Sequence, residues 1–421
     1  MDVLIVLAQS YQIFLLVFMV AYMLQHFLFT YNRLYGEQKN YYHDILDKDV
    51  PQISVLIPMH NEEKVARGIL DRVLMSDYPM DKMEIIPIND HSTDKTKEIL
   101  MEYAKKYSNV LPLHRENRKK RGKTESLNDA MEECKGQIVV VFDADYLPAK
   151  TVIKALVVSF KDPQVGAVMG RVLVKNSATN ILTILLDMER SGGYQVSQQA
   201  RYNMDLIPQY GGTVGAYRKS VVNQMGRFDL KVLAEDTDLT YKMYLNGWKI
   251  AYANKVECYE EMPETWEVRA RQVRRWARGH NEVMFKHFTS LCSSKYLTLK
   301  EKADGLMLLF VYMMPVLLVV GIANSTFLFF MDAIGIINGS LILILILTMN
   351  AFGNFAPFFQ IAIANYLDGR RASLKLVPLF AFNFVLYIYY TTLGFFDALT
   401  DVLTSRDTHW DKTQRFKKET V

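Results

Sequence analysis

The sequence predicts an α/β domain with an open sheet, inserted between membrane helices. Short apolar runs alternate with segments of helical periodicity between residues 47 and 298. Polar motifs follow several of these runs, at the points where the strands would end. Apolar segments lie on both sides of this region. Alternation of this kind is typical of open α/β sheets, whose ligands bind beyond the carboxyl ends of the strands.

The composition divides the chain of 421 residues, half of them hydrophobic, into a soluble domain and a membrane region. Residues 3–30 are nearly uncharged and long enough to cross a hydrocarbon core of ~30 Å. They lack a basic start and a small-residue cleavage site, so we expect an anchor helix rather than a removed signal peptide. The net charge of +4 gives no support for nucleic-acid binding. The three cysteines are scattered, with neither metal spacing nor a disulfide pattern, which fits a reducing cytosol.

Each element of the predicted domain rests on a local pattern. Residues 53–57 form a short apolar run that Pro58 stops, as expected of a buried parallel strand. Helical spacing of apolar residues predicts a helix over residues 62–75, and Ser92-Thr93-Asp94 is expected to cap a helix that continues to about residue 107. Further strands are predicted at residues 84–88, 138–142 and about 166–172, and a further helix at residues 125–134.

Asp143 and Asp145 directly follow the predicted strand at residues 138–142. Residues i and i+2 of a strand point the same way, so these two carboxylates can converge on one hard divalent cation. Asp-x-Asp is also common in turns, where the side chain bonds to its own backbone. Its place after a buried strand, in a sheet with other polar strand ends, favours a metal site.

Three other polar motifs have a functional and a structural interpretation. Asn89-Asp90 could accept from a base or ribose donor, or form a turn into the next helix. Lys123 could meet a phosphate, or belong to a solvated basic loop; the glycine spacing around it excludes a P-loop. Glu235 and Asp236 could supply a general base, or an acidic first helical turn that complements the helix dipole.

The run Gln-Val-Arg-Arg-Trp places Gln272, Arg275 and Trp276 at helical positions i, i+3 and i+4. An amide, a guanidinium and an indole then share one face and could grip a pyrophosphate and stack on a sugar. The alternative is a basic amphipathic helix that lies on a membrane.

In this order and at these spacings, the motifs resemble those of the processive membrane-embedded family 2 glycosyltransferases, the cellulose, chitin, hyaluronan and poly-N-acetylglucosamine synthases. The resemblance covers nearly the whole chain and implies a GT-A-type nucleotide-sugar-binding sheet. Ala234, Asn89 and His91 depart from the usual Thr, Asp and Gly, but they flank the proposed working atoms.

The resemblance also implies roles for individual residues. His60, Asn61 and Glu62 match the first nucleotide-side motif, Asp90 the uracil-binding aspartate, and Lys123 with Asn128 an element near the diphosphate. Asp143 and Asp145 match the site for Mg²⁺ or Mn²⁺, Asp236 the general base beside Glu235, and Gln272, Arg275 and Trp276 the motif of the processive branch. Gly211, Gly212 and Thr213 could line the acceptor site, although a plain turn also explains the glycines. Thr413 and Arg415 are similar to a gating loop, with a basic juxtamembrane tail as the alternative.

The implied function is inverting transfer from a UDP-sugar, with UDP-glucose favoured, to a growing β-linked polysaccharide that crosses the membrane. UDP-N-acetylglucosamine as donor, a single transfer to a polyprenyl phosphate, and a transporter with an inactive nucleotide-binding domain are the alternatives. The expected location is the plasma membrane, as a multi-pass protein with a cytosolic catalytic domain; accessory secretion subunits would be compatible with this function.

The expected organisation is an anchor at residues 1–47, a catalytic domain at 48–262, amphipathic interfacial helices at 263–303, and a channel region with a tail at 304–421. Residues 305–331, 336–363 and 377–396 could each span a membrane. Three full passes would place the basic tail at residues 415–418 outside, contrary to the positive-inside rule. One of these stretches is therefore expected to be interfacial, re-entrant or irregular.

Overall fold

The computed structural model describes residues 2–39, 45–118, 122–333 and 355–404. Its centre is one mixed sheet in the order β3-β2-β1-β4-β7-β6-β8-β5. The strands are β1 Ile53–Met59, β2 Met83–Asn89, β3 Leu113–His114, β4 Ile138–Val141, β5 Leu147–Pro148, β6 Val165–Val174, β7 Gly215–Arg218 and β8 Lys249–Glu260.

The four predicted strands are present as β1, β2, β4 and β6. The first three run parallel, with Val55 opposite both Ile85 and Val140. The β7 strand is antiparallel to β4 and β6, which the expectation of strand–helix alternation did not include. Strands β3 and β5 are only two residues long, too short to carry a period-2 pattern.

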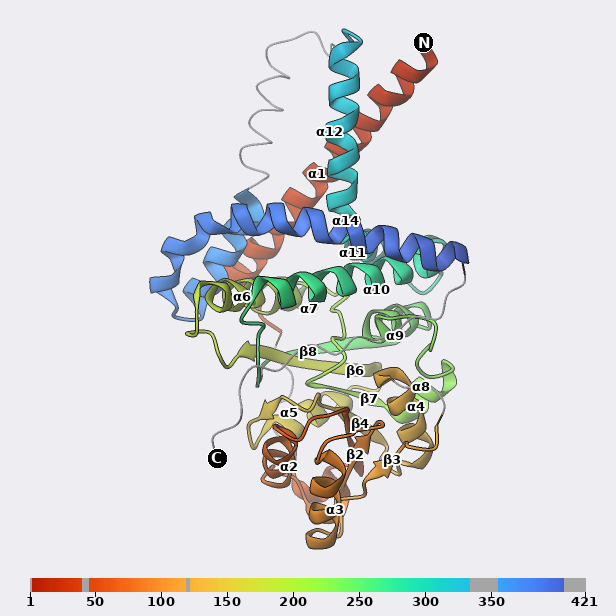
Figure 1. Ribbon diagram of the computed structural model, residues 1–421, viewed down its shortest axis with the longest axis vertical. Coiled ribbons are helices and arrows are strands. Elements are labelled where there is room, and N and C mark those ends of the chain that lie inside the picture. Colours follow the sequence, from red (N-terminus) through yellow and green to blue (C-terminus); the bar gives the residue numbers. More distant parts are fainter. Residues whose placement is uncertain (1, 40–44, 119–121, 334–354, 405–421) are drawn as a thin grey trace.

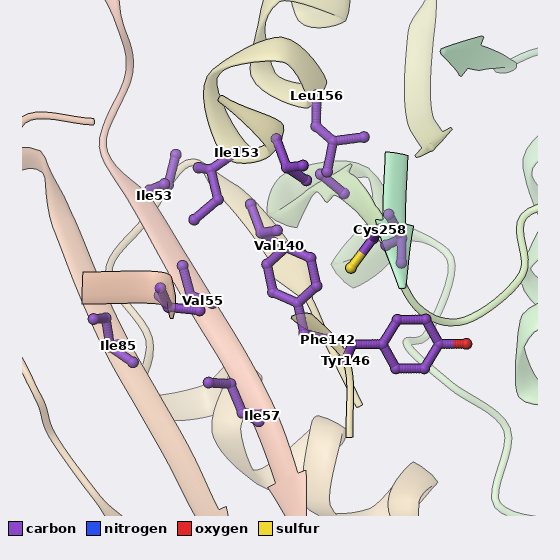
Figure 2. Packing of buried hydrophobic residues seen from close by; sticks show 14 of the residues in the cluster. Ile53, Val55, Ile57, Ile85, Val140, Phe142, Tyr146, Ile153, Leu156 and Cys258 are labelled. Carbon is purple, nitrogen blue, oxygen red and sulfur yellow. The ribbon is translucent and has the colours of Figure 1, made fainter. Parts of the chain in front are cut away.

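Both faces of the central strands are buried, which explains why β1, β4 and β6 are nearly continuous apolar runs. On one face Ile53, Val55 and Ile57 pack with Val140 and the residues shown in Figure 2. On the other face Leu56 joins a second cluster that includes helices of the membrane-proximal layer.

Helices pack on both faces of the sheet. The first cluster includes residues of α2 Ala66–Leu74, α3 Thr96–Lys106 and α5 Val152–Val157. The second includes residues of α4 Lys123–Glu133, α8 Lys219–Gln224 and α9 Glu235–Leu245, and α9 lies on the side of the membrane-like segments (Figure 1). The α2 helix begins later than predicted because Asn61 has a left-handed φ of 54° and the Glu62 N–H donates to Thr96 Oγ1. These residues form the turn between β1 and α2.

A layer of helices lies between the sheet and the membrane-like segments (Figure 1). It consists of α6 Ile181–Ser191, the π-helical turn Gly192–Gln198, α7 Gln199–Asn203, α10 Trp266–Ser293 and α11 Leu299–Leu309. The α14 helix, Phe380–Thr404, lies lengthwise over α10. Arg269 bonds to Tyr387, and Arg274 and Arg278 pair with Asp397 and Asp401, so the two helices run side by side.

The α1 helix, Asp2–Tyr35, and α12, Met314–Phe330, extend together away from the sheet (Figure 1). Tyr11 donates to the Leu317 carbonyl over 2.7 Å and Asn324 to the Ala8 carbonyl over 2.8 Å. By length and apolar composition, α1 and the segment Arg371–Thr404 could each cross a membrane, and α11 with α12 could form a third span bent by 73°.

The predicted stretch at residues 377–396 does not run alongside α1 and α12. It falls in the 3-10 turn Arg371–Leu379 and in α14, which runs crosswise to α12 in Figure 1. Its outward face carries exposed apolar side chains, among them Phe382, Val385 and Tyr389. Most of the stretch at residues 336–363 lies outside the described residues, apart from the helix Phe355–Leu367.

Candidate active site

The Lys123 side chain joins three of the predicted motifs. Its Nζ lies 3.0 Å from Asp143 Oδ1 and 3.4 Å from Glu235 Oε1, and it donates to the Gly212 carbonyl over 3.0 Å. Lys123 opens α4, Asp143 follows β4, Gly212 precedes β7 and Glu235 opens α9. Four segments separated in sequence therefore meet at the carboxyl end of β4.

The charged groups at this meeting point influence one another's protonation. Burial works against the Lys123 charge, but the attraction of Asp143, Glu235 and Asp236 prevails and raises the Lys123 pKa. Burial raises the pKa of Glu235 and of Asp236, and the Lys123 charge opposes that rise. A raised pKa makes a carboxylate a better proton acceptor, the property that a general base needs.

The two Asp236 carboxylate oxygens have different surroundings. Oδ1 accepts from the Thr237 N–H over 2.6 Å. Oδ2 lies on the side of Gly212, since a Cβ on that glycine would stand 3.2 Å from it. Gly212 has a φ of +72°, which a side chain would strain. Its glycine identity therefore has a local cause in both conformation and space.

Asp143 and Asp145 could hold a divalent ion. The side chain of Asp143 is 31% exposed, and its backbone N–H donates to Thr213 Oγ1. Among the described residues, no three His, Cys, Asp or Glu side chains form a closed metal cage. Two carboxylates fit Mg²⁺ or Mn²⁺ at a nucleotide site, because Mg²⁺ is usually bound by one or two carboxylates together with substrate phosphates.

On the nucleotide side, Asp90 is already engaged within the protein. Its Oδ1 lies 2.5 Å from Arg115 Nη1 and 2.7 Å from His91 Nδ1, and its Oδ2 accepts from the Gly122 N–H over 2.7 Å. Arg115, which is buried, was not predicted as a site residue. No local sequence pattern indicates a role for it, because the strand before it, β3, has only two residues.

The Pro58–Met59–His60–Asn61–Glu62 motif ties the end of β1 to the end of β2. His60 Nδ1 lies 2.7 Å from the Asp90 carbonyl, and Asn61 Oδ1 accepts from the Thr93 N–H over 2.7 Å. The Glu62 side chain is buried. The observed contacts therefore hold the two loops together at the sheet edge.

Asn128 holds a loop in this structure. Its Nδ2 donates to the Phe228 carbonyl over 2.9 Å, and its Oδ1 accepts from the Phe228 N–H over 3.1 Å. Both ends of the amide are thus used to connect α4 to the segment before α9. Contact with the diphosphate remains a prediction for this residue.

Gln272, Arg275 and Trp276 lie on α10, as their spacing predicted. The Gln272 Oε1 accepts from Arg269 Nη1 over 2.8 Å. The guanidinium carbons of Arg269 and Arg190 lie 4.9 Å and 5.3 Å from the centroid of the Trp276 ring system. Cations therefore lie against the indole on which the acceptor sugar was expected to stack.

A chain of contacts connects Trp276 with the aspartate motif. Arg190 Nε lies 2.8 Å from Glu260 Oε1, and Glu260 Oε2 accepts from the Tyr146 hydroxyl over 2.7 Å. Tyr146 directly follows Asp145. Glu260 ends β8 and Arg190 lies in α6, so no local pattern predicts that they pair.

The remaining predicted residues have simpler outcomes. Gly211 lies against β6, where a Cβ would stand 2.3 Å from Met169 Cε and the flexible Met169 side chain would have to shift. Thr413 and Arg415 lie outside the described residues.

Comparison with known proteins identifies the family of this chain. Residues 51–279 match the family model described as "Glycosyltransferase like family 2". A probable glycosyltransferase of Bacillus subtilis, YdaM, is 31% identical over 380 residues, which cover 88% of each chain.

Two further relatives are named for different products. The poly-beta-1,6-N-acetyl-D-glucosamine synthase of Staphylococcus epidermidis is 29% identical over 60% of this chain and 60% of its own length. The beta-monoglucosyldiacylglycerol synthase of a Nostoc species is 28% identical over 65% of this chain and 58% of its own length. This chain therefore spans less than two thirds of either protein.

Among solved structures, the mannosyltransferase PcManGT of Pyrobaculum calidifontis, in complex with GDP-Man and Mn²⁺, matches with a TM-score of 0.58. The match covers 92% of this chain and 99% of that one, at 19% identity. It shows that the fold is of the GT-A type, as the sequence predicted.

Proposed function

The chain belongs to glycosyltransferase family 2, and from that premise we propose that it is a processive, inverting transferase that extends a β-linked polysaccharide from a UDP-sugar. The observation that carries this proposal is the convergence of Asp143, Gly212 and Glu235 on Lys123. It supports the proposal because it gathers the proposed diphosphate-binding, acceptor and base motifs at one end of the sheet.

Asp236 is the proposed general base. It takes the proton from the acceptor hydroxyl while that oxygen attacks the anomeric carbon and the UDP oxygen leaves on the opposite side, with inversion. Its burial and raised pKa favour proton uptake. The position of Oδ2 beside Gly212 supports an approach of the acceptor along the Gly211–Gly212–Thr213 loop.

The departing diphosphate needs positive charge. Lys123, Arg275 and the Gln272 amide are the proposed protein donors to it. A divalent ion held by Asp143 and Asp145 would neutralise part of the same charge when bound. Preorganised charge of this kind is often the largest contribution to catalysis in a partly dry site.

The donor sugar is proposed to be glucose or N-acetylglucosamine. Both sugars were expected from the sequence, and the names of the two partial relatives contain one each. The test incubates detergent-solubilised protein and Mg²⁺ with each UDP-sugar separately and follows UDP release. Asp236→Asn should abolish release, whereas Glu102→Gln, a matched change of a carboxylate at an exposed pair far from the site, should not. An Asp236→Asn variant with unchanged activity would refute the assignment.

A single transfer to a lipid acceptor is the second candidate. The positions of Arg190 and Arg269 against the Trp276 ring favour it, because a polymer that stacks on Trp276 would have to displace them. The two candidates separate at the product. After extraction with chloroform and methanol, a polymer stays in the insoluble residue and is digested by linkage-specific glycosidases. A glycolipid passes into the organic phase.

The proposed membrane arrangement has α1 and α12 crossing the bilayer, the stretch predicted at residues 336–363 providing the return pass, and α14 lying along the cytosolic surface. The apolar outer face of α14 would enter the lipid, while Asp397 and Asp401 on its inner face pair with α10. Carboxylates are costly in hydrocarbon, which argues against a full pass for this helix. A flat α14 keeps the basic tail on the cytosolic side, in agreement with the positive-inside rule.

Single cysteines introduced into a cysteine-free variant test this arrangement with a reagent that does not cross membranes. Met331→Cys, beyond the far end of α12, should label in intact cells. Thr404→Cys, at the end of α14, and Lys300→Cys, at the start of α11, should label only after permeabilisation. External labelling of Thr404→Cys would refute the flat helix and the gating role of Thr413 and Arg415.

A further inference from the structure

A small hydrogen-bonded cluster lies behind Asp236, on the side away from Gly212. The Thr237 hydroxyl oxygen accepts from Gln209 Nε2 over 2.9 Å and lies 3.2 Å from His280 Nε2. The same oxygen is 3.3 Å from Asp236 Oδ1, which also accepts from the Thr237 N–H over 2.6 Å. Thr237 is 1% exposed. Its hydroxyl is therefore surrounded by two side-chain nitrogens and one carboxylate.

The chemistry of these groups limits where the hydroxyl proton can point. A threonine hydroxyl has one proton to donate and two lone pairs, and the Gln209 amide nitrogen can only donate. His280 is neutral near pH 7, because burial lowers its pKa to about 4, so one of its ring nitrogens carries a proton. If that nitrogen is Nε2, both lone pairs of Thr237 are filled and its proton can only go to Asp236.

We propose that Gln209 and His280 are positioning residues that act through Thr237. Both donate to its hydroxyl oxygen, so that the hydroxyl proton is directed at Asp236 Oδ1 and Oδ2 is left as the oxygen that accepts the proton of the acceptor sugar. The proposal rests on the proposed role of Asp236 as general base. It adds a reason why one particular oxygen of that carboxylate should react.

The geometry on the opposite side of Asp236 agrees with this division. Gly212 leaves space beside Oδ2, since the Cβ that it lacks would lie 3.1 Å from Asp236 Cβ and 3.2 Å from Oδ2. His280 lies one helical turn after Trp276 on α10, and its ring centroid lies 4.6 Å from that of Tyr312. Contacts from α10 therefore reach the base as well as the proposed acceptor site.

Other charged and titratable groups also act on Asp236, and the variants below leave them in place. They are Lys123 of α4, Glu235 of α9 itself, Tyr194 of the π-helical turn, Tyr210 before β7 and Tyr312 between α11 and α12.

The test compares three pairs of variants by UDP release over a range of pH: Thr237→Val with Thr237→Ser, His280→Phe with His280→Gln, and Gln209→Leu with Gln209→Glu. Thr237→Val should lower kcat by about tenfold or more, because a hydrogen bond to a charged group is lost. The KM for the UDP-sugar should stay the same. The acidic limb of the pH profile should move to higher pH, since hydrogen bonds donated to a carboxylate favour its charged form.

The partner variants separate proton direction from packing. Thr237→Ser keeps the hydroxyl and should restore the wild-type pH profile. His280→Gln can still donate and should stay within about twofold of wild type, whereas His280→Phe should lose about three- to tenfold in kcat. Gln209→Leu should behave like His280→Phe. Gln209→Glu replaces the donor with an acceptor and should be at least as damaging.

Several results would overturn the proposal: a Thr237→Val profile that matches wild type, equal loss in His280→Phe and His280→Gln, or a change in KM alone. If Thr237→Val does not fold, Gln209→Leu decides, because Gln209 lies outside the helices. Absence of UDP release by the wild-type protein with every UDP-sugar would instead refute the proposed function. If the wild-type protein is active but the pH profiles of the variants match the wild-type profile, only the positioning role of Gln209 and His280 is refuted.

Discussion

Loss of the buried ion pair between Asp304 and Arg201 should weaken the attachment of α1 and α11 to the catalytic domain. Asp304 Oδ1 lies 3.0 Å from Arg201 Nε and accepts from Gln25 Nε2 over 2.8 Å. Asp304 Oδ2 accepts from the Ile207 N–H over 3.1 Å. One carboxylate thus connects α1, α7, α11 and the segment that leads to Gly211. The perturbation is Asp304→Asn, which removes the charge but keeps one oxygen acceptor.

The expected magnitude follows from burial. The side chains of Arg201 and Asp304 are 11% and 3% exposed. Removing one partner of a buried pair leaves the other charge uncompensated and typically costs about 3–5 kcal/mol. The Arg67–Glu102 pair, with side chains 51% and 59% exposed, is the matched control. Glu102→Gln should lower the free energy of unfolding far less, because solvent already screens that pair.

Urea unfolding of the detergent-solubilised protein, followed by tryptophan fluorescence, measures both free energies of unfolding. The double variant Arg201→Met/Asp304→Asn should recover most of the loss, since it leaves no unpaired charge. A loss below about 1 kcal/mol for Asp304→Asn, equal to the surface control, would refute the reasoning. Failure of the double variant to recover would show that the pair itself is not the cause.

Three further predictions concern α10, α14 and the site. Burial raises the Glu282 pKa from 4.5 to about 7, so this carboxyl contributes stability that is complete below pH 4.5 and is lost as the pH rises through about 7. In urea unfolding, the free energy of unfolding of Glu282→Gln should match that of wild type at pH 4.5. At pH 8 it should exceed the wild-type value by up to roughly 3 kcal/mol. Gly394→Leu should lower the free energy of unfolding by about 1–3 kcal/mol and separate α14 from α10, because a Cβ there would lie 2.5 Å from the Arg274 carbonyl oxygen. Gly193→Ala is the control, since a Cβ at Gly193 would have no atom within 4 Å. Equal melting temperatures of the two variants would contradict this packing. Lys123→Met should move the acidic limb of UDP release to higher pH, because Glu235 and Asp236 lose their counter-charge. Lys123→Arg should move it less, and an unmoved limb would show that Lys123 does not set the protonation of the proposed base.

Much of the catalytic fold could be predicted because its strands are buried on both faces. The runs at β1, β2 and β4 are continuous and apolar, and each is followed by polar residues at its carboxyl end. The β7 strand was missed because it has only four residues, Gly215–Arg218, and contains both a glycine and an arginine. Its antiparallel direction depends on where the chain returns after α6 and α7, which no local pattern encodes.

The sequence indicates the candidate motif residues, but not the contacts between them. Spacing along one segment indicated the carboxylates at Asp143 and Asp145 and the face that begins at Gln272. The Lys123 position between two acidic motifs depends on the relative placement of α4 and α9. The same holds for Arg115 against Asp90 and for His280 behind Thr237, since each pair joins side chains more than twenty residues apart.

The arrangement of α14 depends on charges rather than on mean hydropathy. Segment Arg371–Thr404 passes a length and hydropathy criterion for a membrane span, yet two of its carboxylates, Asp397 and Asp401, lie four residues apart on one face. Arg274 and Arg278 of α10 have the same spacing, and the two pairs meet at 2.6 Å and 2.5 Å. Matching i, i+4 charges on two distant segments therefore indicate helices that lie side by side, because each charge then has a partner outside the hydrocarbon. The matching charge spacing is present in the sequence. The apolar run alone does not show it, because the run ends at residue 396, just before the first of these carboxylates.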